Sequence, residues 1–276
     1  MYRGFYLNLA RNAERRETLV RRLRAIGAEQ RYERCEAIDG WAVAAQYATK
    51  LDPGNLGLWL THEKVLQSLG SSTAAHLHII EDDAQLPNNV VALLDRVLKQ
   101  LEAQNATWDL IFTDAFVPPH TEFFQLFAEK VKLHAETKAH TLVDLARIPF
   151  FGTSSLIINK SSLAKYVSLL TGNWALGRPI DMYLRDLIQR GQLKALITVP
   201  YMTSISAHSD ASDIRGPLDR SRRVCDIFRR AFFQDADLPA LLAEMQSLTA
   251  DAKISPLAML FVNAEAFVLS DQWVKF

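Results

Sequence analysis

Short apolar segments of strand length alternate with amphipathic segments of helix length through the first 115 residues. The first helical segment, for example, opens at Asn12, a helix N-cap residue type, and closes at Gly27. Strands that alternate with helices favour a mostly parallel sheet with helices on both faces. The sequence therefore predicts a Rossmann-like α/β fold, with strands at residues 5–9, 32–38, 76–80 and 108–112 and helices at 12–27, 56–69 and 88–101.

The later part of the chain is less regular. Residues 118–149 have the length of a substrate-facing insertion, or of a pair of strands that crosses the sheet edge. Strand character returns at 154–158 and 195–199, helical character at 161–170 and 181–190, and the pattern after residue 218 is mainly helical. The basic residues of this last part predict a solvated helix face; they are Arg220, Arg222, Arg223, Arg229 and Arg230.

The charge balance argues against nucleic acid as a partner. Lys and Arg number 31 and Asp and Glu number 31, so the formal net charge is zero. Such a chain has no global field to attract nucleic acid, and any anion must be held by local groups. Cys35 and Cys225 lie far apart without metal-like spacing, and residues 1–10 contain no long apolar stretch, which predicts a reduced cytoplasmic location. The apolar region at 254–269 is too short and too polar to span a bilayer.

Three consecutive acidic residues, Glu81, Asp82 and Asp83, follow the strand-like segment at 76–80. In open α/β sheets ligands bind beyond the carboxyl ends of the strands, and adjacent carboxylates repel one another unless a cation is present. Side chains alternate along an extended backbone, so Glu81 and Asp83 would share a side and hold one hard cation, Mn²⁺ or Mg²⁺. The alternative is a solvated acidic loop before the next helix.

Two other strand ends carry groups suited to a nucleotide. Arg15 lies at the start of the helix after the first strand and could hold phosphate. Asp39 could bind ribose hydroxyls, and Gly40 would permit close approach of the backbone. Taken singly, Arg15 could equally be an ordinary surface residue, and Asp39 and Gly40 could form an ordinary Asp-Gly turn. The chain contains no GxGxxG or P-loop sequence, which argues against a dinucleotide oxidoreductase and a P-loop NTPase.

Three isolated polar residues are further candidates. His62 lies on the helical segment before the acidic strand, Asp181 lies near a helix start, and His208 belongs to a polar stretch after the last strand. Asp181 could be a catalytic carboxylate and His208 a further metal ligand. The ordinary alternatives are a packing histidine, an acid at a helix N-terminus and a loop histidine.

Short motifs occur in order along residues 2–214. The first four are a strand and arginine-rich turn at 5–16, Ala-Ile-Asp-Gly at 37–40, Gly-Leu-Trp-Leu-Thr-His at 57–62 and Ile-Glu-Asp-Asp at 80–83. The later ones are a segment at 152–159, Pro-Ile-Asp at 179–181 and a weak match to a Ser-Asp-Ile motif at 209–214. In this order they resemble glycosyltransferase family 25, which includes bacterial lipopolysaccharide and lipooligosaccharide sugar transferases and collagen galactosyltransferases. The chain departs from the family pattern at Leu58 and Thr61, which replace a cysteine and a serine, and the segment at 152–159 lacks a tyrosine.

The resemblance implies a GT-A type fold, with a nucleotide-binding part at 1–115, an acceptor part at 116–214 and a C-terminal helical extension at 215–276. It also implies inverting transfer of galactose or glucose from a UDP-hexose to a glycan acceptor, as in the synthesis of lipopolysaccharide, lipooligosaccharide or another surface glycan. Its implied site residues are a general base at Asp181 with Asp114 in reserve, metal ligands at Glu81, Asp83 and His208, and donor contacts at Asn8, Arg11, Arg15, Asp39, Gly40, His62 and Asp82.

A lipid-linked acceptor would lie at the inner leaflet of a membrane. We therefore expect cytoplasmic residence with peripheral membrane contact through the arginines between 215 and 230 and the interleaved Phe228, Phe232 and Phe233. Two other classes compete with the transferase. A family-25-like chain could bind a nucleotide sugar or glycan without turnover. A metal-dependent phosphoesterase or nucleotidyltransferase fits less well, because such enzymes usually use two metals and more clustered acids or histidines.

Overall fold

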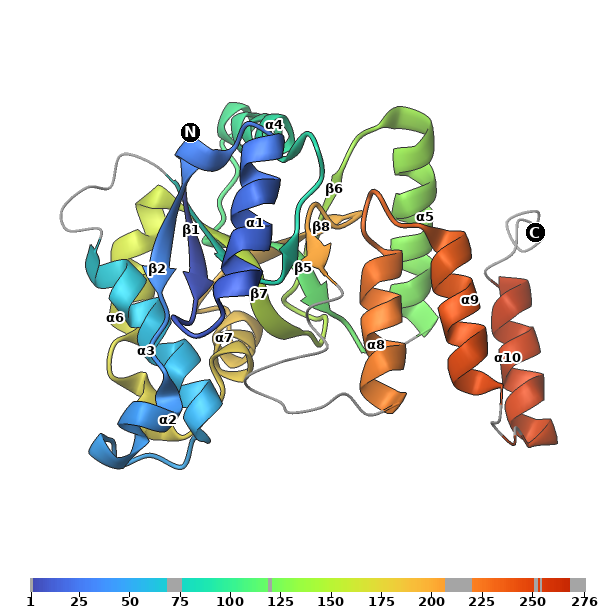
Figure 1. The fold of residues 1–276 in the computed structure, drawn as a ribbon. Helices are drawn as coiled ribbons and strands as arrows, with labels where there is room; N and C mark the ends of the chain where they lie inside the picture. The colour runs from blue at the N-terminus through green and yellow to red at the C-terminus, as the bar shows by residue number, and fades with distance from the viewer. Residues whose placement is uncertain are drawn as a thin grey trace.

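A seven-stranded sheet forms the centre of the molecule, with strand order β2-β1-β3-β7-β5-β8-β6 (Figure 1). The structure is a computed structural model that describes residues 2–68, 76–118, 121–206, 220–250, 253 and 255–268. A separate two-stranded sheet joins β4 (Ala84–Gln85) to β9 (Ser204–Ile205). The strands of the large sheet are β1 (Tyr2–Asn8), β2 (Tyr32–Glu36), β3 (His76–Glu81), β5 (Leu110–Phe116), β6 (Thr141–Asp144), β7 (Phe151–Ile158) and β8 (Ala195–Val199).

Most strands of the large sheet run in one direction. β1 pairs in parallel with β2 and β3, and β5 pairs in parallel with β8. β7 lies antiparallel between β3 and β5, and β6 is antiparallel to β8 at the edge. The carboxyl ends of β1, β2, β3 and β5 therefore meet at one edge of the sheet. This arrangement confirms the predicted Rossmann-like α/β fold and is consistent with the GT-A type.

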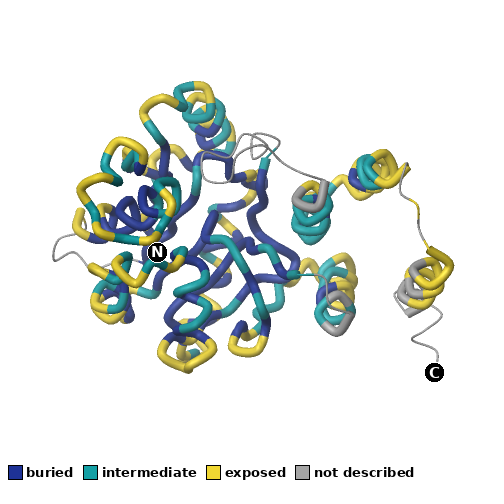
Figure 2. The backbone as a smooth tube through the Cα atoms, turned by 90° about the horizontal axis from the view of Figure 1, so that it is seen from below, coloured by how far each residue is buried: buried dark blue, intermediate teal, exposed yellow. Residues whose placement is uncertain are grey.

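Helices cover both faces of the sheet and enclose a core on each (Figures 1 and 2). In β3, Leu77 and Ile79 belong to one core and Ile80 to the other, as expected of a strand covered on both sides. The helix α4 buries a stripe at helical spacing, from Val90 to Leu101. The helices of one face are α1 (Ala13–Ala25) and α4 (Val90–Ala103); those of the other are α3 (Pro53–Ser68), α6 (Leu163–Leu170) and α7 (Ile180–Gln189).

The segment at 118–149 corrects the prediction of an irregular insertion or a strand pair. It contains the helix α5 (Thr121–Thr137) and a single edge strand, β6. Phe127 of α5 is fully buried, and its ring lies 5.0 Å from that of Phe232 and 6.0 Å from that of Tyr201. Contacts with residues distant in the sequence therefore stabilise this helix, which is why the local pattern did not reveal it.

The C-terminal part is helical, as predicted. It contains α8 (Arg220–Ala231), α9 (Leu238–Thr249) and α10 (Pro256–Val268). The helix α8 packs beside β5 and β9, α9 packs on α8, and α10 lies apart from the sheet in both views (Figures 1 and 2). None of the helices in the described residues is long and apolar enough to cross a membrane.

Candidate functional site

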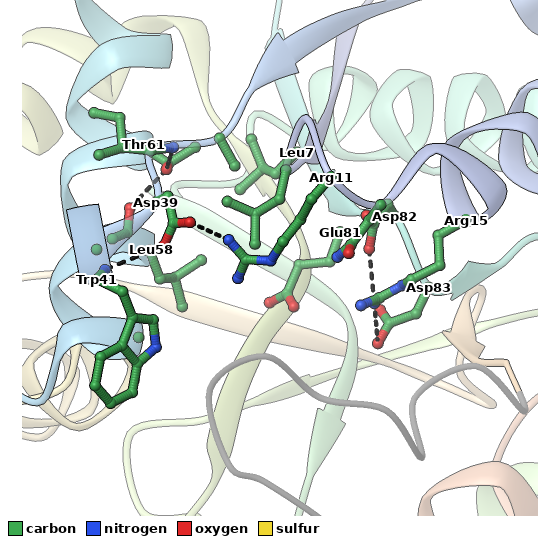
Figure 3. Close-up of a pocket in the computed structure, with 17 residues that line it drawn as sticks. Leu7, Arg11, Arg15, Asp39, Trp41, Leu58, Thr61, Glu81, Asp82 and Asp83 are labelled. Carbon is green, nitrogen blue, oxygen red and sulfur yellow. Dashed lines mark hydrogen bonds and ion pairs between the residues drawn. The ribbon is translucent and has the colours of Figure 1, made fainter. Parts of the chain in front are cut away.

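A pocket lies at the carboxyl ends of β1, β2 and β3, where the α/β architecture places ligand sites (Figure 3). The space between its walls, open solvent at its mouth included, is about 650 Å³. The segments after the three strands and the helix α3 supply its walls. Its polar lining consists of Arg11, Asn12, Arg15, Asp39, Thr61, Glu81, Asp82 and Asp83.

Arg15 of α1 bridges two of the three consecutive acids. Its Nη2 lies 2.7 Å from Oδ1 of Asp82 and 3.1 Å from Oδ2 of Asp83. The amide Nδ2 of Asn8 donates to the other oxygen of Asp82 at 2.7 Å. Asp82 is therefore held against β1 and α1, and Figure 3 shows the Arg15 guanidinium between the Asp82 and Asp83 carboxylates.

Glu81 and Asp83 are acids whose ionised forms the surrounding protein compensates less fully than it does Asp82. Burial, and next the carboxylates of Asp83 and Asp82, raise the pKa of Glu81 to about 8, although Arg229 and Arg15 oppose the shift. Oδ1 of Asp83 is buried and accepts no hydrogen bond from the described residues. Figure 3 shows both side chains directed into the pocket. A hard cation with oxygen ligands would satisfy the free acceptor and lower the repulsion, so this pair of residues fits such an ion.

A complete metal centre is not formed by the described residues alone. Among them, no group of three or more His, Cys, Asp or Glu side chains converges as a metal site requires. The predicted third ligand, His208, lies outside the described residues. The metal thus stays a prediction that is based on Glu81 and Asp83.

Asp39 and Gly40 shape the other end of the pocket. Asp39 forms an ion pair with Arg11, and its Oδ1 accepts a hydrogen bond from the Trp41 backbone N–H at 3.1 Å, which caps the short helix α2 (Gly40–Val43). A Cβ on Gly40 would lie 1.6 Å from the backbone oxygen of Pro53. This glycine therefore permits a close approach between α2 and α3. It also lines the pocket, and its contact with a ligand stays a prediction.

Two predicted donor contacts lie behind the pocket wall instead of lining it. Asn8 is buried, and its Oδ1 accepts from Nε of Arg34 at 3.1 Å, while its Nδ2 serves Asp82. His62 is fully buried, and burial lowers its pKa to about 4. Its neighbour Thr61 lines the pocket, where its hydroxyl accepts from the Ile38 N–H at 2.9 Å and fixes the loop before Asp39. Neither side chain lines the pocket, and a contact of Asn8 or His62 with a donor stays a prediction.

Asp114, the reserve base, is fully buried under α8. Its two oxygens accept from Nε and Nη2 of Arg229 at 2.6 and 2.5 Å, and Oγ of Ser154 donates to it at 3.1 Å. Burial raises the pKa of Asp114, and the Arg229 charge opposes that rise. An acceptor hydroxyl has no free oxygen to approach here, so the geometry favours an anchoring role. The prediction of a solvated basic face is accordingly wrong for Arg229.

Asp181 lies in the first turn of α7, at the sheet edge that carries the pocket. Its Oδ2 accepts from the backbone N–H of Gly152 at 2.9 Å, and its Oδ1 accepts from that of Met182 at 2.8 Å. Gly152 is the second residue of β7, and since β7 is antiparallel, its first residues lie beside the carboxyl ends of β3 and β5. Asp181 is not part of the pocket lining around Glu81. Asp181 on α7 and Glu81 on β3 therefore lie at the same edge of the sheet but belong to different elements.

The phenylalanines of the predicted membrane face are partly or fully buried: Phe228 and Phe232 are half-buried, and residues 207–219 of the basic segment lie outside the described part of the chain. Phe233 is buried, and the Phe232 ring packs 5.8 Å from Tyr201 and 5.0 Å from Phe127. Phe233 is therefore not available to insert into lipid, and Phe232 is largely engaged with the core; the rest of the membrane contact stays a prediction.

Trp41, for which we predicted no role from the sequence, lines the pocket and is 70% exposed. Its position directly after the Asp-Gly pair was the available signal, since a bulky aromatic beside a candidate ribose ligand is suited to contact a ring.

Comparison with known proteins finds a limited similarity. The chain matches no protein-family model. It is 26% identical over 125 residues to the human protein named inactive glycosyltransferase 25 family member 3, and 25% identical over 125 residues to the cattle protein named probable inactive glycosyltransferase 25 family member 3. Each match covers 39% of this chain and 21% of the relative, so the chain spans about a fifth of the length of these relatives. The similarity supports a relationship to glycosyltransferase family 25.

Proposed function

We propose that the protein transfers a hexose, galactose or glucose, from a UDP-sugar to a hydroxyl of a glycan acceptor, with inversion and with Mn²⁺ or Mg²⁺. Lipopolysaccharide, lipooligosaccharide or another surface glycan is the proposed product. One observation carries the proposal: a single pocket at the carboxyl ends of β1, β2 and β3 combines two arginines, a strand-end aspartate and a pair of undercompensated acids.

These groups suit the parts of a nucleotide sugar. Arg11 and Arg15 offer positive charge to a diphosphate. Asp39 follows the second strand, at the place where an acid commonly binds ribose hydroxyls. A divalent cation, when bound to Glu81 and Asp83, would act as a Lewis acid for the charge that grows on the leaving UDP. Asp82, held by Asn8 and Arg15, would present its remaining surface to the sugar.

The acceptor hydroxyl attacks the anomeric carbon of the hexose while the bond from that carbon to the UDP oxygen breaks. An inverting reaction of this kind needs a base to take the hydroxyl proton. We assign that role to Asp181, because Asp114 is enclosed by Arg229 and Ser154. The backbone N–H groups of Gly152 and Met182 orient the Asp181 carboxylate.

The test is a turnover assay with UDP-galactose and UDP-glucose, with Mn²⁺ or with chelator, that measures released UDP. Asp83→Asn removes the charge beside Glu81 and should abolish metal-stimulated turnover while leaving the thermal unfolding temperature in chelator unchanged or higher. Asp235→Asn, an exposed carboxylate elsewhere, is the matched control and should retain full activity. Full activity of Asp83→Asn, or of wild type in excess chelator, would contradict the proposal.

A second candidate function is binding of a nucleotide sugar without turnover. The ion pairs of Arg15 with Asp82 and Asp83 favour it, because they partly neutralise the acids that a cation would need. The human and cattle relatives are also named as inactive and probably inactive. UDP binding without release of UDP from either donor sugar, in the presence of a range of glycan acceptors, would favour this function over transfer.

A further inference from the structure

An exposed tryptophan stands at one end of the candidate pocket. Trp41 is 70% exposed, whereas Trp59 and Trp108 are buried. Figure 3 shows the indole at the end of the pocket opposite Arg15 and Asp83, with Asp39 and Arg11 between them. A tryptophan left in water forgoes the burial of a large apolar surface, and an aromatic face that borders a ligand pocket is suited to stack on a flat ring.

The backbone that carries Trp41 is fixed. Its N–H donates to Asp39 Oδ1 at 3.1 Å, and the preceding Gly40 is packed so closely that a Cβ would lie 1.6 Å from the Pro53 oxygen. Since α2 is held on α3 in this way, the indole is displayed from a rigid base. A preorganised aromatic loses little conformational freedom when it binds a ring.

The pocket therefore has two chemically different ends. Charged groups that suit a diphosphate and a cation line one end, at Arg15, Glu81 and Asp83, and the indole of Trp41 forms the other, beyond Asp39. We propose that Trp41 is the stacking platform for the planar base of the nucleotide, and so sets the direction in which the donor lies in the pocket. This inference rests on the proposed function, because it assumes that a nucleotide occupies the pocket.

The experiment compares two probes, UDP and inorganic pyrophosphate, each titrated calorimetrically with Mn²⁺ into the full chain. Trp41→Leu should weaken UDP binding by about 5- to 100-fold, because that is roughly the affinity lost when an aromatic side chain that stacks on a base is removed. The same substitution should change pyrophosphate binding less than twofold. Trp41→Phe, which keeps an aromatic face, should recover part of the loss. UDP should also quench tryptophan fluorescence in wild type and in the control Trp174→Phe, whose indole packs 4.9 Å from Tyr47, but not in Trp41→Phe.

The outcomes separate this inference from the proposed function. Unchanged UDP affinity in Trp41→Leu would overturn the stacking role and leave nucleotide binding intact. Equal weakening of UDP and pyrophosphate would also overturn it, because Trp41 would then support the pocket as a whole. With UDP-galactose as a third probe, a loss seen with it but not with UDP would likewise overturn stacking on the base, because the indole would then contact the sugar. Absence of UDP binding in wild type would overturn both proposals.

Discussion

Glu81 and Asp83 are two acids of the pocket whose ionised forms the surrounding protein compensates incompletely. Arg15 compensates Asp82 and one oxygen of Asp83, but the second oxygen of Asp83 has no partner among the described residues. Burial and the two neighbouring acids raise the pKa of Glu81. Functional sites often hold such groups at a cost in stability, since a bound ligand relieves the strain.

The raised pKa of Glu81 gives a pH-dependent stability. Below about pH 4 the carboxyl is protonated in both the folded and the unfolded chain. As the pH rises towards 8, the unfolded chain releases this proton while the folded protein retains it, so this residue makes the folded state progressively less stable. In chelator at pH 8, Glu81→Gln should therefore raise the free energy of unfolding by about 1–2 kcal/mol, after allowance for partial exposure, and the unfolding temperature by a few degrees.

The check is thermal unfolding of both proteins between pH 5 and 8. The advantage of Glu81→Gln should shrink as the pH falls to 5, and added Mn²⁺ should stabilise wild type more than the variant. Glu136→Gln, an exposed residue of α5, serves as the control and should match wild type throughout. A constant difference across the pH range would show that Glu81 does not titrate in this window.

A buried ion pair joins α8 to the sheet. Arg229 contacts both oxygens of Asp114 on β5 and also Ser154 on β7. The same arginine lowers the pKa of Glu81, so the helix brings positive charge towards the acidic end of the pocket. Arg230 pairs with Glu244 at 2.7 Å and connects α8 to α9. The first of the C-terminal helices, α8, is therefore anchored to the sheet by a buried ion pair.

Removal of one partner from this pair should destabilise the fold. Arg229→Met leaves the fully buried Asp114 without its cation, and we expect a loss of about 3–5 kcal/mol in the free energy of unfolding, measured in urea. The double variant Asp114→Leu with Arg229→Met should recover most of this loss, because no charge remains buried. Arg223→Met, exposed on the same helix, should change stability by less than about 0.5 kcal/mol. Equal stability of the Arg229 and Arg223 variants would refute the anchoring role.

The same elements show what the sequence could and could not predict. Periodicity identified β1, β3, α1, α3 and α4 because each has a local apolar pattern, and it placed the acids of β3 at a ligand-binding edge. It missed α5, whose burial depends on Phe232, and it misassigned Arg229, whose partner lies 115 positions away. It also gave no sign that β7 inserts antiparallel between β3 and β5. Pairings over such distances leave no pattern in a single sequence.

Considered as a whole, the molecule divides the proposed reaction between its two halves. Residues before β5 supply the pocket, whereas Asp181 and Gly152 come from the second half and reach the same sheet edge through α7 and β7. β7 makes this possible, because it enters the sheet between β3 and β5 and brings the start of its strand to their carboxyl ends. Donor binding and turnover should therefore be separable by substitution.

Asp181→Asn tests that separation. The asparagine keeps one side-chain oxygen to accept the Gly152 N–H, so the start of α7 should stay in place, but an amide cannot take a proton from the acceptor hydroxyl. We expect transfer to fall by about 10²–10⁴-fold, with UDP affinity within twofold of wild type by calorimetry. Asp186 lies on the same helix and pairs with Arg178, which precedes the helix. The control Asp186→Asn should leave both quantities nearly unchanged. If Asp181→Asn turns over at the wild-type rate, the base is another group, and Asp181 serves only to hold β7 against α7.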